Sequence, residues 1–166
     1  MKKLSLATTI VILLLVCSDG IQAQTTQSTL SQVELMKQFI GTWKFDLATD
    51  TTIFWDLKTF GIGMEGNFRI VANGKTLMEG KQLWGYDINL DKWISAQMMR
   101  GMPIQLYAHW FASKNKWITI SYKDIPNPEN ASEKWDMEFK SPDVLTNSWI
   151  RNNKLIEVKT FTRVKE

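Results

Sequence analysis

His109 is the first residue to consider for chemistry, because it is the only histidine in the 166-residue sequence. A lone histidine can ligate haem iron or act as a general base. It lies in a stretch whose apolar residues alternate, and we predict that Ile104, Leu106, Ala108 and Trp110 face inward. That direction would turn His109 outward. We therefore expect a surface or edge position, with haem ligation or base catalysis as the alternative.

The stretch "GIGMEG" matches the spacing of a dinucleotide-binding loop, with glycines at Gly61, Gly63 and Gly66. Such a loop must be followed by a helix, whose N-terminus holds the phosphates. The residues that follow, "NFRIVANGKTL", are typical of a strand and a hairpin instead. We interpret these glycines as positions where strands bend.

Other side chains offer little chemistry. Asp136 and Glu138 share a charged strand face with lysines, which does not resemble a buried acid pair. The methionines of "QMMRGMP" could hold a soft metal such as Cu(I), although methionine more often provides adaptable packing. One histidine and one cysteine are too few for a zinc site of several such ligands. The sequence therefore predicts no catalytic residues, no metal site and no cofactor.

The N-terminus predicts export. Residues 1–23 contain two lysines, an apolar run and then small and polar residues, which is the pattern of a secretory signal peptide of bacterial type. Cleavage would remove Cys17, so we expect a secreted or periplasmic protein without disulfides and without a transmembrane segment. The alternative is a protein anchored by a lipid on Cys17. A net charge of +3 indicates no nucleic-acid partner.

The rest of the chain indicates one all-β domain. After a flexible connector at residues 24–30, the apolar spacing predicts a short helix over 31–40, with Ser31 as its N-cap and Gly41 at its end. From there, turn residues recur at regular intervals and imply about ten strands. We expect residues 31–166 to form an antiparallel up-and-down β-barrel closed at one end by the helix.

The stretch "EKWDMEFK" shows the expected alternation most clearly, because its apolar and charged residues occupy opposite faces. One apolar face per strand suits a closed barrel. In an even-stranded meander the last strand ends where the first begins, so Trp43 and Arg163 would be neighbours. We predict that Trp43 plugs the base and that Arg163 lies across its ring. However, inward-facing Ile156 and Val158 would put Arg163 outward unless a bulge intervenes.

These residues carry a resemblance to a known group of barrels. Gly41-Thr42-Trp43 after a short helix, with Arg163 near the C-terminus, resembles the G-x-W and terminal arginine of the calycins, which include lipocalins and fatty-acid-binding proteins. The ending "FTRVKE" is similar to the last strand of fatty-acid-binding proteins. The stretch "EGKQLWGYDINLDKW" resembles a hairpin of secreted bacterial lipocalin-like families of unknown function. We interpret Gly41, Trp43 and Arg163 as structural residues.

The expected function is to bind a small hydrophobic ligand inside the barrel. The predicted inward lining consists of Trp55, Phe68, Ile70, Met78, Leu106, Ile120, Tyr122, Trp135, Met137 and Val158. Two alternatives stay open: a barrel filled by its own side chains that acts through surface contacts, and haem binding through His109 as in nitrobindin-like barrels. The sequence leaves the oligomeric state open.

Overall fold

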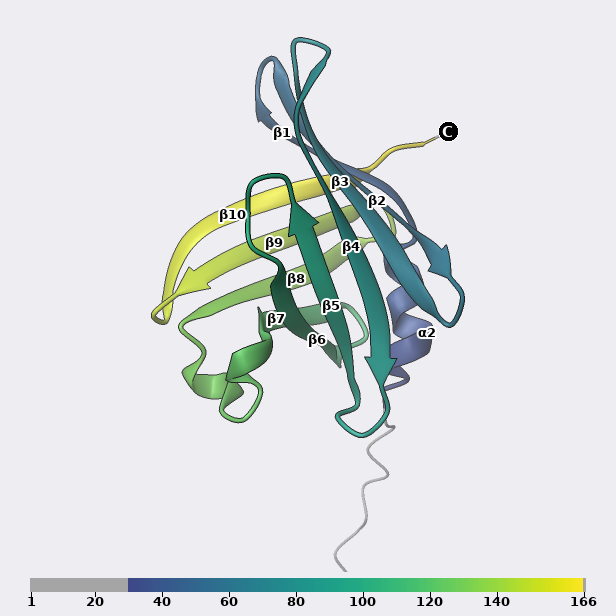
Figure 1. Ribbon diagram of the computed structural model, residues 1–166, viewed down its shortest axis with the longest axis vertical. Coiled ribbons are helices and arrows are strands. Elements are labelled where there is room, and N and C mark those ends of the chain that lie inside the picture. The colour runs from purple at the N-terminus through teal and green to yellow at the C-terminus, as the bar shows by residue number, and fades with distance from the viewer. Residues whose placement is uncertain (1–29, 166) are drawn as a thin grey trace, which may run out of the picture.

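The computed structural model describes residues 30–165. The predicted signal peptide at residues 1–23, Cys17 and most of the connector at 24–30 lie outside the described residues. The described part is a closed antiparallel barrel of ten strands in up-and-down order, as the sequence predicted (Figure 1). The strands are β1 (Gly41–Ala48), β2 (Thr51–Phe60), β3 (Gly63–Ala72), β4 (Lys75–Asp87), β5 (Lys92–Met99), β6 (Gln105–Ser113), β7 (Lys116–Ser121), β8 (Glu133–Ser141), β9 (Val144–Arg151) and β10 (Lys154–Arg163).

One short helix precedes the barrel and closes one end of it. The α-helix α2 (Gln32–Met36) continues into a single 3-10 turn, η2 (Lys37–Phe39). Ser31 caps the helix as predicted, because its side-chain oxygen accepts a hydrogen bond from the Glu34 backbone N–H at 3.4 Å. The side chains of Met36 and Phe39 are buried, so this segment contributes its apolar side to the barrel interior.

The long connection between β7 and β8 lies at the other end, which we call the mouth (Figure 1). It contains two more 3-10 turns, η3 (Tyr122–Asp124) and η4 (Pro128–Asn130). The β1–β2, β3–β4, β5–β6 and β9–β10 turns reach the same side of the barrel, because successive strands alternate in direction.

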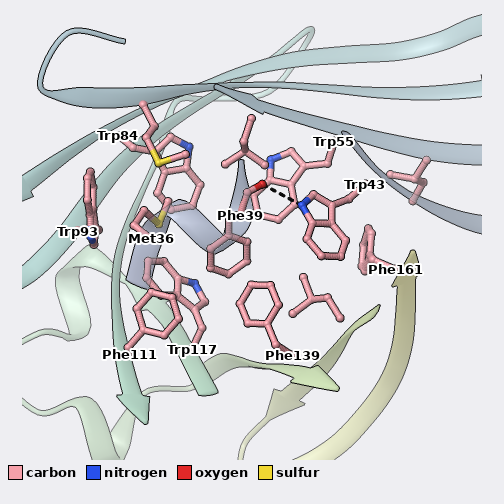
Figure 2. Close-up of a cluster of buried hydrophobic side chains, with 14 residues drawn as sticks. Met36, Phe39, Trp43, Trp55, Trp84, Trp93, Phe111, Trp117, Phe139 and Phe161 are labelled. Carbon is pink, nitrogen blue, oxygen red and sulfur yellow. Dashed lines mark hydrogen bonds between the residues drawn. The ribbon is translucent and has the colours of Figure 1, made fainter. Parts of the chain in front are cut away.

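The predicted plug is present at the helix end. Trp43 is fully buried, and its indole Nε1 donates a hydrogen bond to the Phe39 carbonyl at 2.9 Å (Figure 2). The Arg163 guanidinium lies 4.2 Å from the centre of the Trp43 ring. Arg163 also donates from Nη2 to the Gln38 carbonyl at 2.8 Å and from Nη1 to the Ile40 carbonyl. Arg163 therefore ties the last strand to the segment that precedes the first.

Gly41 makes this contact possible. Its backbone has a φ of +119°, which side chains of L residues rarely adopt. A Cβ atom at this position would lie 2.8 Å from Nη1 of Arg163. Glycine is thus required here both for the backbone conformation and for the close approach of the guanidinium.

The predicted inward faces of three strands, β6, β7 and β10, are wrong. In β6 the inward side chains are Tyr107, His109 and Phe111, whereas Leu106 is 47% exposed. The outer face of β6 is also partly apolar because η3 packs against this strand, so its alternation does not identify the inner face.

In β10 the inward set is Lys159, Phe161 and Arg163, while Ile156 and Val158 are half exposed. Arg163 therefore lies on the inward face of β10, and the expectation that strand alternation turns it outward does not hold. Here the charged ends of two inward side chains lie against aromatic rings, which a pattern of apolar residues cannot reveal.

We predict that Trp43→Ala lowers the free energy of unfolding by about 3 to 5 kcal/mol, because it removes a fully buried ring. The control is Trp110→Ala, since Trp110 is only partly buried and lies beside Lys92 on the outer face. Urea denaturation of both variants measures the difference. Equal losses of stability would contradict the plug.

Candidate binding cavity

The barrel contains a cavity of about 290 Å³ above a cluster of buried aromatic side chains. The cluster fills the helix end, where the Phe39 ring lies 4.8 Å from the Phe139 ring and 5.1 Å from the Trp117 ring, centre to centre (Figure 2). Interior volume remains only where these rings end. The residues that line the cavity are Ile53, Trp55, Phe68, Gln82, Trp84, Gln97, Met99, Tyr107, His109, Thr119, Trp135, Met137, Asn147, Lys159 and Phe161.

Four residues of the predicted lining do face this cavity: Trp55, Phe68, Trp135 and Met137. Ile70 and Met78 pair with each other across β3 and β4, outside the cavity lining. Whether any of these residues contacts a ligand stays a prediction.

The other four predicted lining residues lie elsewhere. Leu106 and Tyr122 border a recess outside the barrel, and Val158 is 52% exposed. Ile120 is fully buried, but it lies on the face of β7 opposite Thr119, which lines the cavity. The inward direction predicted for Leu106, Ile120 and Val158 followed from the wrong choice of face in their strands. Tyr122 belongs to η3, after β7 has ended.

A chain of side-chain hydrogen bonds crosses the cavity wall. Trp55 Nε1 donates to Gln82 Oε1 at 2.8 Å, and Gln82 Nε2 donates to Gln97 Oε1 at 2.6 Å. Gln97 Nε2 and the Tyr107 hydroxyl both donate to Gln105 Oε1, at 3.3 and 3.0 Å. The chain fixes the orientation of each amide in turn, so these polar groups are satisfied without a ligand.

Gly66 allows the first bond of this chain. The bond from Trp55 on β2 to Gln82 on β4 passes over β3 at Gly66. A Cβ atom on Gly66 would lie 3.2 Å from Gln82 Oε1 and 3.3 Å from Trp55 Nε1, which is tighter than ordinary packing. The third glycine of "GIGMEG" thus makes room for a hydrogen bond between side chains.

His109 is inside the barrel, contrary to the surface or edge position that we expected. It is 3% exposed and stacks on Trp117 at a centre-to-centre distance of 5.4 Å. Its Nε2 atom lies 2.8 Å from Ser95 Oγ, and its Nδ1 atom lies 2.9 Å from Thr119 Oγ1. Burial lowers the pKa of His109 to about 3, so the imidazole is neutral. Iron ligation or base catalysis would require one of these hydrogen bonds to break.

The wall opposite the glutamine chain is less completely paired. Asn147 and Lys159 are neighbours in the register of β9 and β10. The Oδ1 atom of Asn147 is buried and has no hydrogen-bond partner among the described residues. The Lys159 ammonium pairs with Glu157 at 2.9 Å. This wall therefore offers an unused hydrogen-bond acceptor beside a cation that already has a partner.

The polar lining residues, such as Gln82, Gln97 and Asn147, do not follow from the alternation of apolar residues on which the predicted lining was based. The pairing of β4 with β5 puts Gln82 opposite Gln97, and that of β9 with β10 puts Asn147 opposite Lys159. Correct strand registers would have brought these polar side chains together on one face.

No protein-family model matches this chain, and no curated protein matches its sequence. The closed barrel of ten antiparallel strands is consistent with a calycin-like fold. Within residues 30–165, no helix has the length and apolar character needed to cross a membrane.

We predict that His109 makes the stability pH-dependent. The unfolded chain takes up a proton below a pKa of about 6.5, while the folded protein keeps His109 neutral down to a pKa of about 3. The stabilising contribution is therefore complete above pH 6.5 and is lost as the pH falls toward 3, at about 1.4 kcal/mol per pH unit.

Urea unfolding between about pH 7 and 5 measures this slope in a range above the ordinary pKa of carboxylic acids. His109→Gln removes the titrating group and should remove its share of the slope. Equal slopes for the two proteins, or an NMR titration of His109 near pH 6.5 in the folded state, would contradict a buried neutral imidazole.

Proposed function

We propose that this protein binds a small, mainly apolar molecule inside the barrel. The observation that carries the proposal is the cavity of about 290 Å³, lined largely by aromatic and aliphatic side chains. Ligand pockets typically measure about 300 to 1,000 Å³, so the size favours a single ring system or a short alkyl chain. Burying such a ligand against Phe68 and Trp135 supplies the favourable free energy.

The cavity wall that contains Asn147 and Lys159 favours a ligand that carries a hydrogen-bond donor. The unpaired Asn147 Oδ1 can accept a hydrogen bond from a hydroxyl or N–H group. Leaving a buried acceptor unpaired costs about 1 to 3 kcal/mol, and a ligand donor would recover part of this cost. The glutamine chain needs no further partner and restricts how the ligand can lie.

We further propose that the protein is a calycin-like barrel exported from the cytoplasm. The plug formed by Gly41, Trp43 and Arg163 supports the calycin relationship, and the pattern of residues 1–23 supports export. Mass spectrometry of the exported protein should find a chain that begins directly after Ala23. An acylated N-terminal Cys17 would instead indicate the lipid-anchored form, and a chain retaining residues 1–23 would contradict export.

The binding proposal is tested by titration with short alcohols, fatty acids, sterols, retinoids and haem while tryptophan fluorescence is recorded. Trp55, Trp84 and Trp135 line the cavity, so a bound ligand should change their emission. We expect a short-chain or single-ring alcohol to bind, and Met137→Trp to weaken binding at least about tenfold because the larger ring occupies the cavity.

The matched control is Glu138→Trp, which introduces the same ring at the next residue of β8. The Glu138 side chain faces outward and pairs with Lys140, so a ring there does not enter the cavity. Thermal melts verify that both variants fold. If no member of the panel binds, a barrel that acts through surface contacts becomes the better hypothesis. A haem absorption band that His109→Ala abolishes would replace the proposal with haem binding.

A further inference from the structure

At the mouth, β7 ends before β6, the strand on one side of it. β7 ends at Ser121, where the last pairs are Tyr107↔Ser121 with β6 and Ile120↔Lys134 with β8. β6 continues past Tyr107 toward the mouth, to Gln105, whereas β8 begins at Glu133, which lies level with Ser121 in the strand register. The chain between them leaves the wall and forms η3 and η4. Within the described chain, the mouth end of β6 therefore has no strand partner on its β7 side.

Two aromatic side chains lie together beside the mouth end of β7. The rings of Tyr107 and Trp135 meet edge to face, 5.6 Å apart between centres and at 89°. Both residues line the cavity, and both also line a recess of about 440 Å³ on the outside of the barrel. The two rings thus belong to the lining of both spaces, and a change of their side-chain rotamers would alter the boundary between the spaces.

The outer recess is suited to a cation. Oδ2 of Asp124 is buried there without a hydrogen-bond partner, and Asp124 forms no ion pair with any residue of the described chain. Glu133 also lines the recess and pairs with Arg151 at 2.6 Å. Lys123 lines the recess as well, but it is exposed and leaves Asp124 unpaired. Asp124 is therefore a carboxylate that lacks its counter-charge.

Aromatic rings surround the same recess. Tyr107, Tyr122 and Trp135 line it together with Asp124. Ring faces attract an ammonium group, and a carboxylate accepts charge-assisted hydrogen bonds from it. The cavity lining inside the barrel, by contrast, contains no carboxylate among the described residues, so an ammonium group there would be buried without a counter-charge. The charges therefore favour a cationic group in the recess and an uncharged chain in the cavity.

We propose that the recess binds the protonated amine head group of an amphiphile whose apolar chain lies in the barrel cavity. The chain passes between Tyr107 and Trp135, and the ammonium group pairs with Asp124. This inference rests on the proposed binding function and names its ligand class as an alkylamine or a related amine with a short apolar body.

Octylamine, octanol and octanoate share one chain and differ in head group, so their dissociation constants test the inference. We expect octylamine to bind most tightly. Asp124→Asn should weaken octylamine binding by about 10- to 100-fold, the value of one hydrogen bond to a charged group, and leave octanol binding unchanged. The matched control is Glu129→Gln, which removes a carboxylate from η4 outside the recess lining. Met137→Trp should weaken both ligands, because both chains need the cavity.

The outcomes separate the inference from the function on which it rests. If octanol binds and Met137→Trp weakens it, but octylamine binds no more tightly or is insensitive to Asp124→Asn, the amine head-group site is overturned and the cavity function stands. If neither octanol nor octylamine binds the natural protein, the cavity function is overturned together with the inference. Tighter binding of octanoate than of octylamine would likewise overturn the amine assignment.

Discussion

The barrel depends on one contact, the Arg163 guanidinium over the Trp43 ring. β1 and β10 pair only through Trp43↔Arg163 and Lys44↔Thr162, so the seam that closes the barrel is short. Around it, Arg163 donates hydrogen bonds to the carbonyls of Gln38, Ile40 and Pro142. One side chain therefore joins the last strand, the helical segment and the β8–β9 turn. The absence of a side chain at Gly41 lets the guanidinium approach this closely.

The same closure explains why the interior has two different parts. The helical segment inserts Met36 and Phe39 into one end, and rings from several strands pack around them (Figure 2). This end is filled, and the burial of these apolar side chains stabilises the barrel. Toward the mouth the side chains are more polar and are held by hydrogen bonds, so a cavity remains. The filled end and the cavity thus lie at opposite ends of one barrel.

Much of this architecture follows from the sequence. The turn residues between short alternating stretches predicted the ten-stranded meander, and the positions of Gly41, Trp43 and Arg163 predicted the plug. The inner faces of β6, β7 and β10 did not follow, because β6 and β7 are partly apolar on both faces and β10 points charged side chains inward. His109 was misplaced for the same reason. The polar half of the cavity arises from residues far apart in sequence that only the correct strand registers bring together.

Native-state hydrogen exchange tests most directly whether the plugged end holds the barrel together. At that end the amide of Val164 donates to the Thr42 carbonyl at 2.8 Å, and at the mouth the amide of Asn73 donates to the Asp50 carbonyl at 3.0 Å. Each is a single backbone hydrogen bond near the end of a strand, and the two N···O distances are similar. Bond length alone would therefore not give the two amides different protection. We expect the Val164 amide to exchange only through global unfolding and the Asn73 amide to exchange through local opening. Equal protection of the two amides, or stronger protection of Asn73, would contradict this expectation.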